Sequence, residues 1–413
     1  MALPVEELAK VSATYQVALT SLGVTAAREI MYLWQDVSYG TGSSMAGVSK
    51  FVTRAVKLIG YRRKRALAIT DAFVRLSRAL ATGFSTPHLD GFPLDDGPAV
   101  GEATSGSAKK EASGEPPKST PETHKKASVE HLKVLREEFV QSIEKYAPTA
   151  LEEPVRIEDE NPVDDKDESY APEEPDYDSY EPYKLEDWTD DDLITIEDID
   201  DLQETIDSQE DAADAEMRHL MKLIAQEKLE DEMAVIAEEK AIEQEKAEKA
   251  KEEAYMMAGL TAARHGERIV MNGGRHTLVN HSDKDKRAIG FVRVHHPEHG
   301  DAPCGFCAML ISRSVFYKSA KTAQHKGQNA QDDAFHTNCH CSAEPVYSKE
   351  QFETSDRFKM NRELAELWKK SSRSNDSTWK QDVSDHVAGR ASAADKKFQE
   401  EKLDSQEEDN ARE

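Results

Sequence analysis

The chain of 413 residues carries 80 acidic and 53 basic side chains, a net charge of −27, and only 38% of its residues are hydrophobic. Soluble domains average about 45–50% apolar residues, so this composition predicts that much of the chain lies outside packed cores. No stretch approaches the roughly 18 consecutive apolar residues of a membrane-spanning helix. Glu6 and Glu7 stand where a signal peptide would carry positive charge. We therefore expect the protein to work in the reducing compartment where its host cell makes it.

The charge is distributed unevenly along the chain. Residues 151–200 hold 22 acidic and 3 basic residues, whereas residues 1–85 hold 11 basic and 5 acidic residues. This asymmetry predicts a basic end that meets an acidic partner or nucleic acid, and an acidic segment that repels nucleic acid.

Residues 1–85 predict a bundle of four short amphipathic helices, because apolar residues recur there at steps of three and four. Thr25 is the expected cap of the second helix, and the third is expected to break near Gly60. A basic run lies between the third and fourth helices and consists of Arg62, Arg63, Lys64 and Arg65. This run is either a solvated helix face or a contact site for phosphate or an acidic partner.

The middle of the chain predicts little packed structure. Residues 86–130 have the composition of a flexible linker, and a short helix over 131–149 follows. The acidic segment 150–195 is expected to be disordered, either as a solvated spacer or as a peptide that docks on a basic surface. Residues 196–265 predict one long polar helix, a strut or weak coiled coil rather than a core element.

Residues 266–350 predict a small α+β domain, beginning where Gly273 and Gly274 are expected to end the long helix. The segment that begins at Cys304 is expected to continue as a short buried turn of helix from Ala308 to Ile311, and the tail over 351–413 is charged. Four runs have the composition of strands, namely residues 276–281, 288–295, 315–317 and 343–347. A core of this size is only marginally stable on its own, and such small domains are commonly stabilised by a structural metal ion. The predicted fold class is therefore mainly α: a helical bundle, a long polar helix, a small α+β domain and large disordered segments.

All four cysteines of the chain lie within 38 residues, at Cys304, Cys307, Cys339 and Cys341. Clustered thiols in a reducing compartment favour a metal over a disulfide framework. A CxxC pair binds one ion from a tight turn, and a second pair from a distant loop completes the tetrahedron of a structural Zn²⁺ site. Reduced thiols packed without metal, and disulfide or redox chemistry, are the alternatives.

The fourth ligand is left open by the spacing. Residues two apart in a strand face opposite sides. Hence either the chain bends at His340 so that Cys339 and Cys341 both bind, or His336 replaces one of these cysteines. A further group of histidines, His295, His296 and His299, is expected to lie at the surface or around the site rather than to bind the metal.

The run from Cys304 to Tyr317, together with the closing HTNCHC from His336 to Cys341 and with Pro345, resembles the C-terminal domain of MuF-like minor head proteins of tailed bacteriophages. The closest group is the minor capsid proteins of actinobacterial phages. The resemblance is specific over residues 288–347, although Ser314 stands where glycine is expected.

The resemblance implies a structural head-morphogenesis protein without an established catalytic centre. The implied location is the capsid interior near the portal, after assembly in the host cytoplasm. The implied partners are the portal protein and the major capsid or scaffolding protein, with packaged DNA as a further contact and no membrane.

Two other functions are weighed against this one. A capsid maturation protease would draw its nucleophile from Ser312, Ser314 or Ser319, but no protease motif surrounds these residues. A zinc-stapled regulator that binds nucleic acid would use the basic run Arg62–Arg65, but the cysteine region lacks a concentrated basic and aromatic surface.

Overall fold

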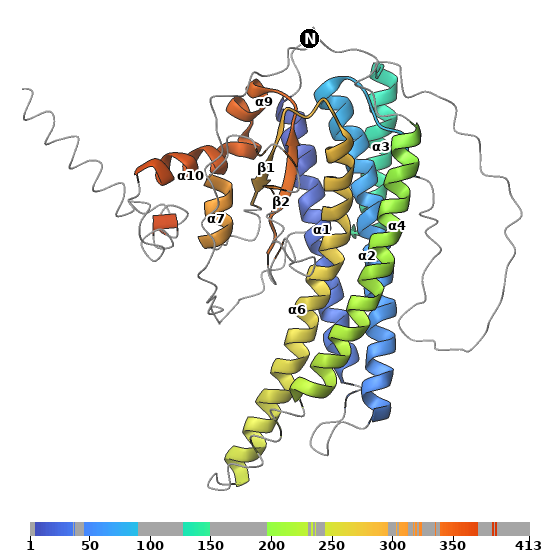
Figure 1. Cartoon of the computed structure of the whole chain (residues 1–413), viewed down its shortest axis with the longest axis vertical. Coiled ribbons are helices and arrows are strands. Elements are labelled where there is room, and N and C mark those ends of the chain that lie inside the picture. The colour runs from blue at the N-terminus through green and yellow to red at the C-terminus, as the bar shows by residue number, and fades with distance from the viewer. Residues whose placement is uncertain are drawn as a thin grey trace, which may run out of the picture. The chain divides into compact units, whose positions relative to one another are not determined.

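The computed structural model of the chain describes residues 5–35, 45–89, 127–148, 196–229, 244–295, 305–312 and 339–370, with single positions around them. The described residues are mainly helical and include one two-stranded sheet, which confirms the predicted fold class (Figure 1). Among these residues, no helix combines the length and the hydropathy needed to cross a membrane.

Contacts divide the chain into two compact units. The first, here called the helical unit, comprises Leu22–Ser142 and Leu193–Thr277. The second, here called the mixed unit, comprises Met1–Ser21, Ile143–Asp192 and Leu278–Glu413.

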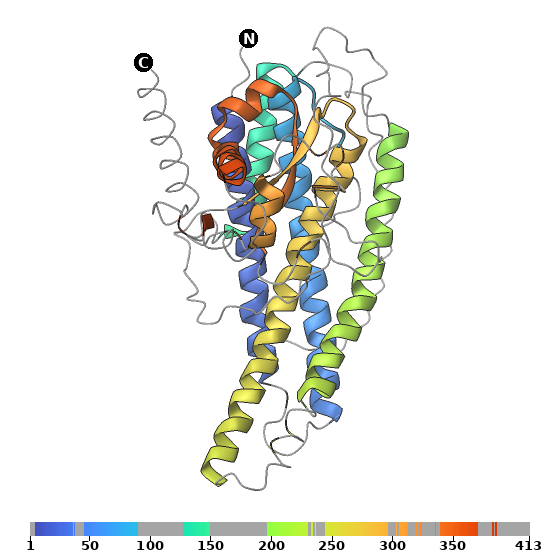
Figure 2. The ribbon, with the colours of Figure 1, turned by 60° about the vertical axis from the view of Figure 1, so that its left-hand side comes forward.

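The helical unit is built from long helices. Helix α1 spans Val5–Trp34 and belongs to this unit from Leu22 onward, and α2 spans Met45–Thr82. Helix α3 spans Val129–Tyr146, close to the short helix predicted over 131–149, and belongs to this unit as far as Ser142. Helix α4 (Ile196–Lys222) continues into a π-helical turn, Leu223–Lys228, and lies along α2 (Figures 1 and 2).

The prediction of four short helices in the first 85 residues is wrong, because α1 and α2 are each continuous. Thr25 lies inside α1, and Gly60 lies inside α2. Helical periodicity cannot distinguish two helices from one when the apolar face stays in register. Gly23, inside α1, lies at a close contact, because a Cβ atom there would lie 2.9 Å from Met271 Cγ.

Helix α4 is a core element and not the predicted strut. Its Leu202 and Ile206 are buried in one cluster with Leu67 of α2 and with Leu89. Met217 and Met221 of α4 are also buried. The polar composition of this helix reflects its exposed face, while its apolar stripe packs in the core.

The long helix predicted over 196–265 is in fact two helices, because α6 (Gln244–Lys284) is separate from α4. Helix α6 continues through Gly273 and Gly274, where an end was predicted, and residues 276–281 are helical rather than a strand. Glycine costs a helix about 0.8–1 kcal/mol relative to alanine. Packing offsets this cost, since the flanking Met271 and Arg275 are both buried.

Two predicted segments fall almost entirely outside the described residues. They are the flexible linker over 86–130 and the acidic segment over 150–195. Of the linker, residues 86–89 and 127–130 are described, and Leu89 is fully buried.

The mixed unit contains the sheet. Strand β1 (Gly290–Val294) pairs antiparallel with β2 (Ser342–Val346), with Gly290 opposite Val346 and Val294 opposite Ser342. Both strands were predicted. Of the third predicted strand, Tyr317 forms an isolated bridge with Phe291.

Helices cover the sheet within the mixed unit. Helix α7 (Gly305–Ser312), which was predicted, contacts β1, and α10 (Lys359–Lys370) lies across α7 in both views (Figures 1 and 2). Between β2 and α10, Ser348 caps helix α9 (Lys349–Thr354), which a 3₁₀ turn, Asp356–Phe358, follows. Packed structure therefore continues beyond residue 350, where the sequence predicted only a charged tail.

Candidate metal centre

Three of the four cysteines meet in the mixed unit. Cys307 lies in the first turn of α7, and Cys339 and Cys341 lie just before β2. Their Sγ atoms all lie within 4.8 Å of one another, and the Cys307 and Cys339 Sγ atoms are 3.7 Å apart. All three are buried and free of disulfides, so the disulfide alternative has no support at these residues.

The local backbone explains how both members of the CxC pair reach the cluster. Residues 339–341 are irregular, and β2 begins only at Ser342. The strand rule that would place Cys339 and Cys341 on opposite sides therefore does not apply, and both sulfur atoms reach the cluster. The other two predicted ligands, Cys304 and His336, lie outside the described residues.

The cluster lies in an apolar core. Cys307, Cys339 and Cys341 pack in one buried group with Ala308, Ile311, Phe335, Leu364, Leu367 and Val383. Two of these residues come from α10, beyond the boundary predicted at 350. Such a shell excludes water and lowers the local dielectric constant, which strengthens any interaction between a cation and the thiolates.

One cation already faces the sulfur atoms. Arg293 on β1 is 1% exposed, and its Nη2 lies 3.5 Å from both Cys307 Sγ and Cys339 Sγ. Its guanidinium also lies over the Phe335 ring, 4.6 Å from the centroid. Burial by itself would lower the pKa of Arg293, but the electrostatic effect of the three nearby cysteines outweighs it and raises the pKa above its usual range.

The thiols themselves resist ionisation in the absence of a further cation. The pKa of Cys339 is raised, first through its hydrogen bond with Cys307, and the pKa of Cys341 is raised well above its usual value of 9.0 by hydrogen bonds to Cys307 and Cys339 and by burial. Three thiolates in one dry site repel one another, so full ionisation requires more positive charge than one guanidinium supplies.

The geometry fits a tetrahedral metal ion. With Zn–S bonds of about 2.3 Å, two sulfur ligands of a tetrahedron lie about 3.8 Å apart. The observed separation of 3.7 Å between Cys307 and Cys339 matches this value. Soft thiolate donors select Zn²⁺, Cu⁺ or iron–sulfur clusters over Mg²⁺ and Ca²⁺.

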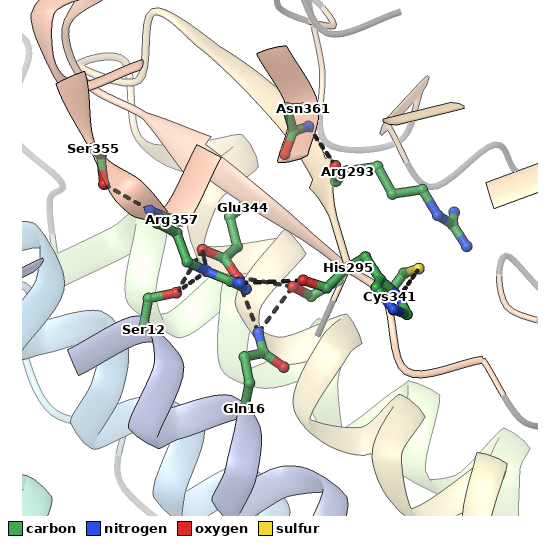
Figure 3. A network of polar contacts seen from close by, with 10 residues as sticks. Ser12, Gln16, Arg293, His295, Cys341, Glu344, Ser355, Arg357 and Asn361 are labelled. Atoms are coloured by element: carbon green, nitrogen blue, oxygen red, sulfur yellow. Dashed lines mark hydrogen bonds and ion pairs between the residues drawn. The ribbon is translucent and has the colours of Figure 1, made fainter. Parts of the chain in front are cut away.

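A second buried polar group lies near the cluster and was missed by sequence reasoning (Figure 3). The Glu344 carboxylate on β2 pairs with Arg357 Nη2 at 2.5 Å, and both side chains are about 5% exposed. Glu344 also accepts hydrogen bonds from Ser12 at 2.8 Å and from Gln16 at 3.0 Å, both on α1. The sequence signal for this network was a glutamate within a predicted strand, over residues 343–347.

The basic run lies inside helix α2 and is largely satisfied within the helical unit. Arg62 pairs with Glu29 at 2.6 Å, and the buried Arg63 pairs with Glu210 and donates to the Ile269 carbonyl at 2.7 Å. The Arg65 guanidinium contacts the Tyr61 ring, and the Lys64 side chain is exposed. Acidic partners of this run are therefore present within the chain, and contact with phosphate stays a prediction.

A protein-family model matches part of the chain. Residues 209–371 match the family model described as VG15 protein, a family of phage virion genes, and this match supports a phage protein. The matched region contains Arg293 and all three clustered cysteines. No curated protein and no solved structure matches the chain.

Proposed function

We propose that this chain is a structural minor capsid protein of a tailed phage, of the MuF-like type, which acts near the portal during head assembly. The observation that carries the proposal is that the region similar to the VG15 family contains a buried three-cysteine cluster at the centre of a small core. A role in DNA packaging or ejection belongs to the same proposal.

In this proposal the cysteine cluster binds a structural Zn²⁺ ion. A closed site of buried thiolates suits a structural ion, because catalytic zinc keeps one position open to water or substrate. Bound metal would link α7 to the start of β2, two segments more than 30 residues apart, and so lower the free energy of the folded mixed unit.

Two of the three hydroxyl groups considered for a protease form local hydrogen bonds, which supports the structural role, and Ser314 lies outside the described residues. Ser312 Oγ donates to the Met309 carbonyl at 2.8 Å, within its own helix. Ser319 Oγ lies 3.1 Å from Thr322 Oγ1 in a local turn. A serine nucleophile needs a base within hydrogen-bond reach, and these observed bonds are to local backbone or hydroxyl groups.

The test is the composition of the virion. Purified phage heads should contain the full chain in low copy, and crosslinking should join it to the portal protein and to the major capsid or scaffolding protein. A phage that carries Cys307→Ser and Cys341→Ser should lose the protein from its particles. Val134→Ser, at an exposed position of α3, is the control and should leave incorporation unchanged. Absence of the chain from wild-type particles would refute the proposal.

A further inference from the structure

Three sulfur atoms leave one position of a tetrahedral site to be filled. His295 follows β1 directly and is 8% exposed. Its Nδ1 lies 3.8 Å from Cys341 Sγ, and Figure 3 shows the ring directed at that sulfur. The sequence had suggested that His295 lies around the site without binding the metal.

This separation is close to that of two ligands of one ion. With Zn–N bonds of about 2.0–2.1 Å and Zn–S bonds of about 2.3 Å, a nitrogen and a sulfur ligand lie about 3.6 Å apart in a tetrahedron. The observed distance of 3.8 Å between Nδ1 and Sγ is slightly longer, and a small movement of the imidazole ring would remove the difference.

The backbone that carries His295 is held from two sides. Arg357 Nη1 donates to the His295 carbonyl at 3.3 Å, and Asn361 Nδ2 donates to the Arg293 carbonyl at 2.8 Å. These bonds fix the end of β1 against the 3₁₀ turn and α10. A ligand on a fixed backbone binds metal with little loss of conformational entropy.

Charge balance also favours histidine as the fourth ligand. Zn²⁺ with three thiolates and a neutral imidazole carries a net charge of −1, whereas Zn²⁺ with four thiolates carries −2. Arg293 supplies one buried positive charge against the sulfur atoms. One guanidinium therefore neutralises a site of three cysteines and one histidine and leaves a four-cysteine site with an uncompensated buried charge.

We propose that His295 is the fourth ligand of the metal centre, through Nδ1, with Cys307, Cys339 and Cys341 as the other three. This assignment rests on the metal centre proposed above. Arg293 is then the residue that balances the charge of the site, and it donates hydrogen bonds to two of the thiolates.

The test uses the full chain loaded with Co²⁺ under reducing conditions. The sulfur-to-cobalt absorption band counts the thiolate ligands, and the d–d bands respond when imidazole is exchanged for another ligand. Wild type should show three thiolates and one nitrogen, and X-ray absorption of the Zn²⁺ form should agree. His295→Cys should raise the thiolate count to four, and His295→Ala should weaken metal binding at least tenfold, a loss comparable to that seen on removing groups around metal sites.

Variants of the two ligands predicted from sequence serve as controls. Cys304→Ser and His336→Asn should leave the cobalt spectrum unchanged. An unchanged spectrum in His295→Cys, with folding verified by circular dichroism, would overturn the assignment, as would loss of one thiolate in Cys304→Ser or a changed d–d band in His336→Asn. Failure of wild type to bind cobalt at all would instead refute the metal centre itself, so the two failures are distinguishable.

Discussion

Arg293 illustrates how single residues determine the properties of the cysteine cluster. Its guanidinium touches two sulfur atoms and an aromatic ring in a fully buried position. A buried charge is stable only when paired. The thiolates of a metal-loaded cluster and this guanidinium therefore stabilise each other.

We accordingly predict that Arg293→Gln weakens Zn²⁺ binding about 10- to 100-fold, the usual effect of removing a hydrogen-bonding group around a metal site. Competition with a chromophoric chelator measures this affinity. The matched control is Arg62→Gln, which removes an arginine that pairs with Glu29 in the helical unit. Equal affinities in wild type and Arg293→Gln would show that the guanidinium does not stabilise the bound thiolates.

Glu344 and Arg357 form the second residue-scale feature with a measurable consequence. Removing one charge of a buried ion pair leaves the other uncompensated and costs about 3–5 kcal/mol. Glu344→Gln should lower the free energy of unfolding by about this amount in urea denaturation. The control is Glu353→Gln, whose pair with Lys349 is exposed and contributes about 1 kcal/mol or less.

The same pair predicts acid sensitivity. Burial alone would raise the pKa of Glu344. The positive charge of Arg357 and the hydrogen bonds from Arg357, Ser12 and Ser342 outweigh burial and lower this pKa below the usual 4.5. A carboxylate whose pKa is depressed on folding contributes stability above its unfolded pKa and loses this contribution as the pH falls through its folded pKa. Wild type should therefore lose stability below about pH 4–5 more steeply than Glu344→Gln. Parallel pH profiles for the two proteins would contradict this.

At the scale of elements, glycines set how closely α6 approaches α1. A Cβ atom on Gly259 would lie 2.5 Å from Cδ1 of Trp34. The indole is fixed, since its Nε1 donates to the Tyr255 carbonyl at 3.0 Å and the ring packs against Phe51. The side chain of Trp34 therefore cannot move aside cheaply.

We predict that Gly259→Ala destabilises the protein despite the better helix propensity of alanine. Overpacking costs about 1–3 kcal/mol, which exceeds the gain in propensity of about 0.8–1 kcal/mol. Gly60→Ala is the control, because a Cβ atom there meets only Asp214 Oδ1 at 3.7 Å. That substitution should stabilise the protein by up to about 1 kcal/mol. Thermal melting of both variants tests the contrast, and stabilisation by Gly259→Ala would show that α1 and α6 adjust freely.

The sequence predicted some elements correctly but misplaced two helix ends at glycines. The positions of β1, β2, α3 and α7 followed from local periodicity and composition. Gly60 and Gly273 lie inside α2 and α6, where helix ends were predicted. The prediction failed because a glycine inside a helix and a glycine after one have the same sequence signature. Only the neighbouring helix reveals that Gly23 serves close packing.

At the scale of the whole molecule, each of the two units contains its own clusters of buried residues. The helical unit buries apolar side chains between helices such as α2 and α4. The described part of the mixed unit contains the cysteine cluster and the sheet. Bound metal should therefore stabilise the mixed unit and have little effect on the stability of the helical unit.

We predict that removal of the metal with a chelator at neutral pH raises hydrogen exchange in β1, α7 and β2 at least tenfold and leaves α2 and α4 protected. Structural zinc contributes directly to folding free energy, so the unit that binds it loses stability on chelation. Exchange measured by mass spectrometry, with and without added Zn²⁺, tests this. Unchanged protection in the mixed unit after complete metal removal would exclude a structural role for the ion.

The sequence by itself determined that the protein is mainly helical, that a small α+β region contains the strands β1 and β2, and that its cysteines are candidate metal ligands. These features depend on residue spacing along a short stretch of chain, which local periodicity and ligand chemistry express directly. Tertiary structure alone decided that Cys339 and Cys341 face one site, that Arg293 contacts two sulfur atoms of this site and that His295 points at Cys341. It also decided that Glu344 pairs with Arg357. These contacts join residues that are far apart along the chain, and their energies come from burial and charge pairing that exist only once the strands and helices have packed.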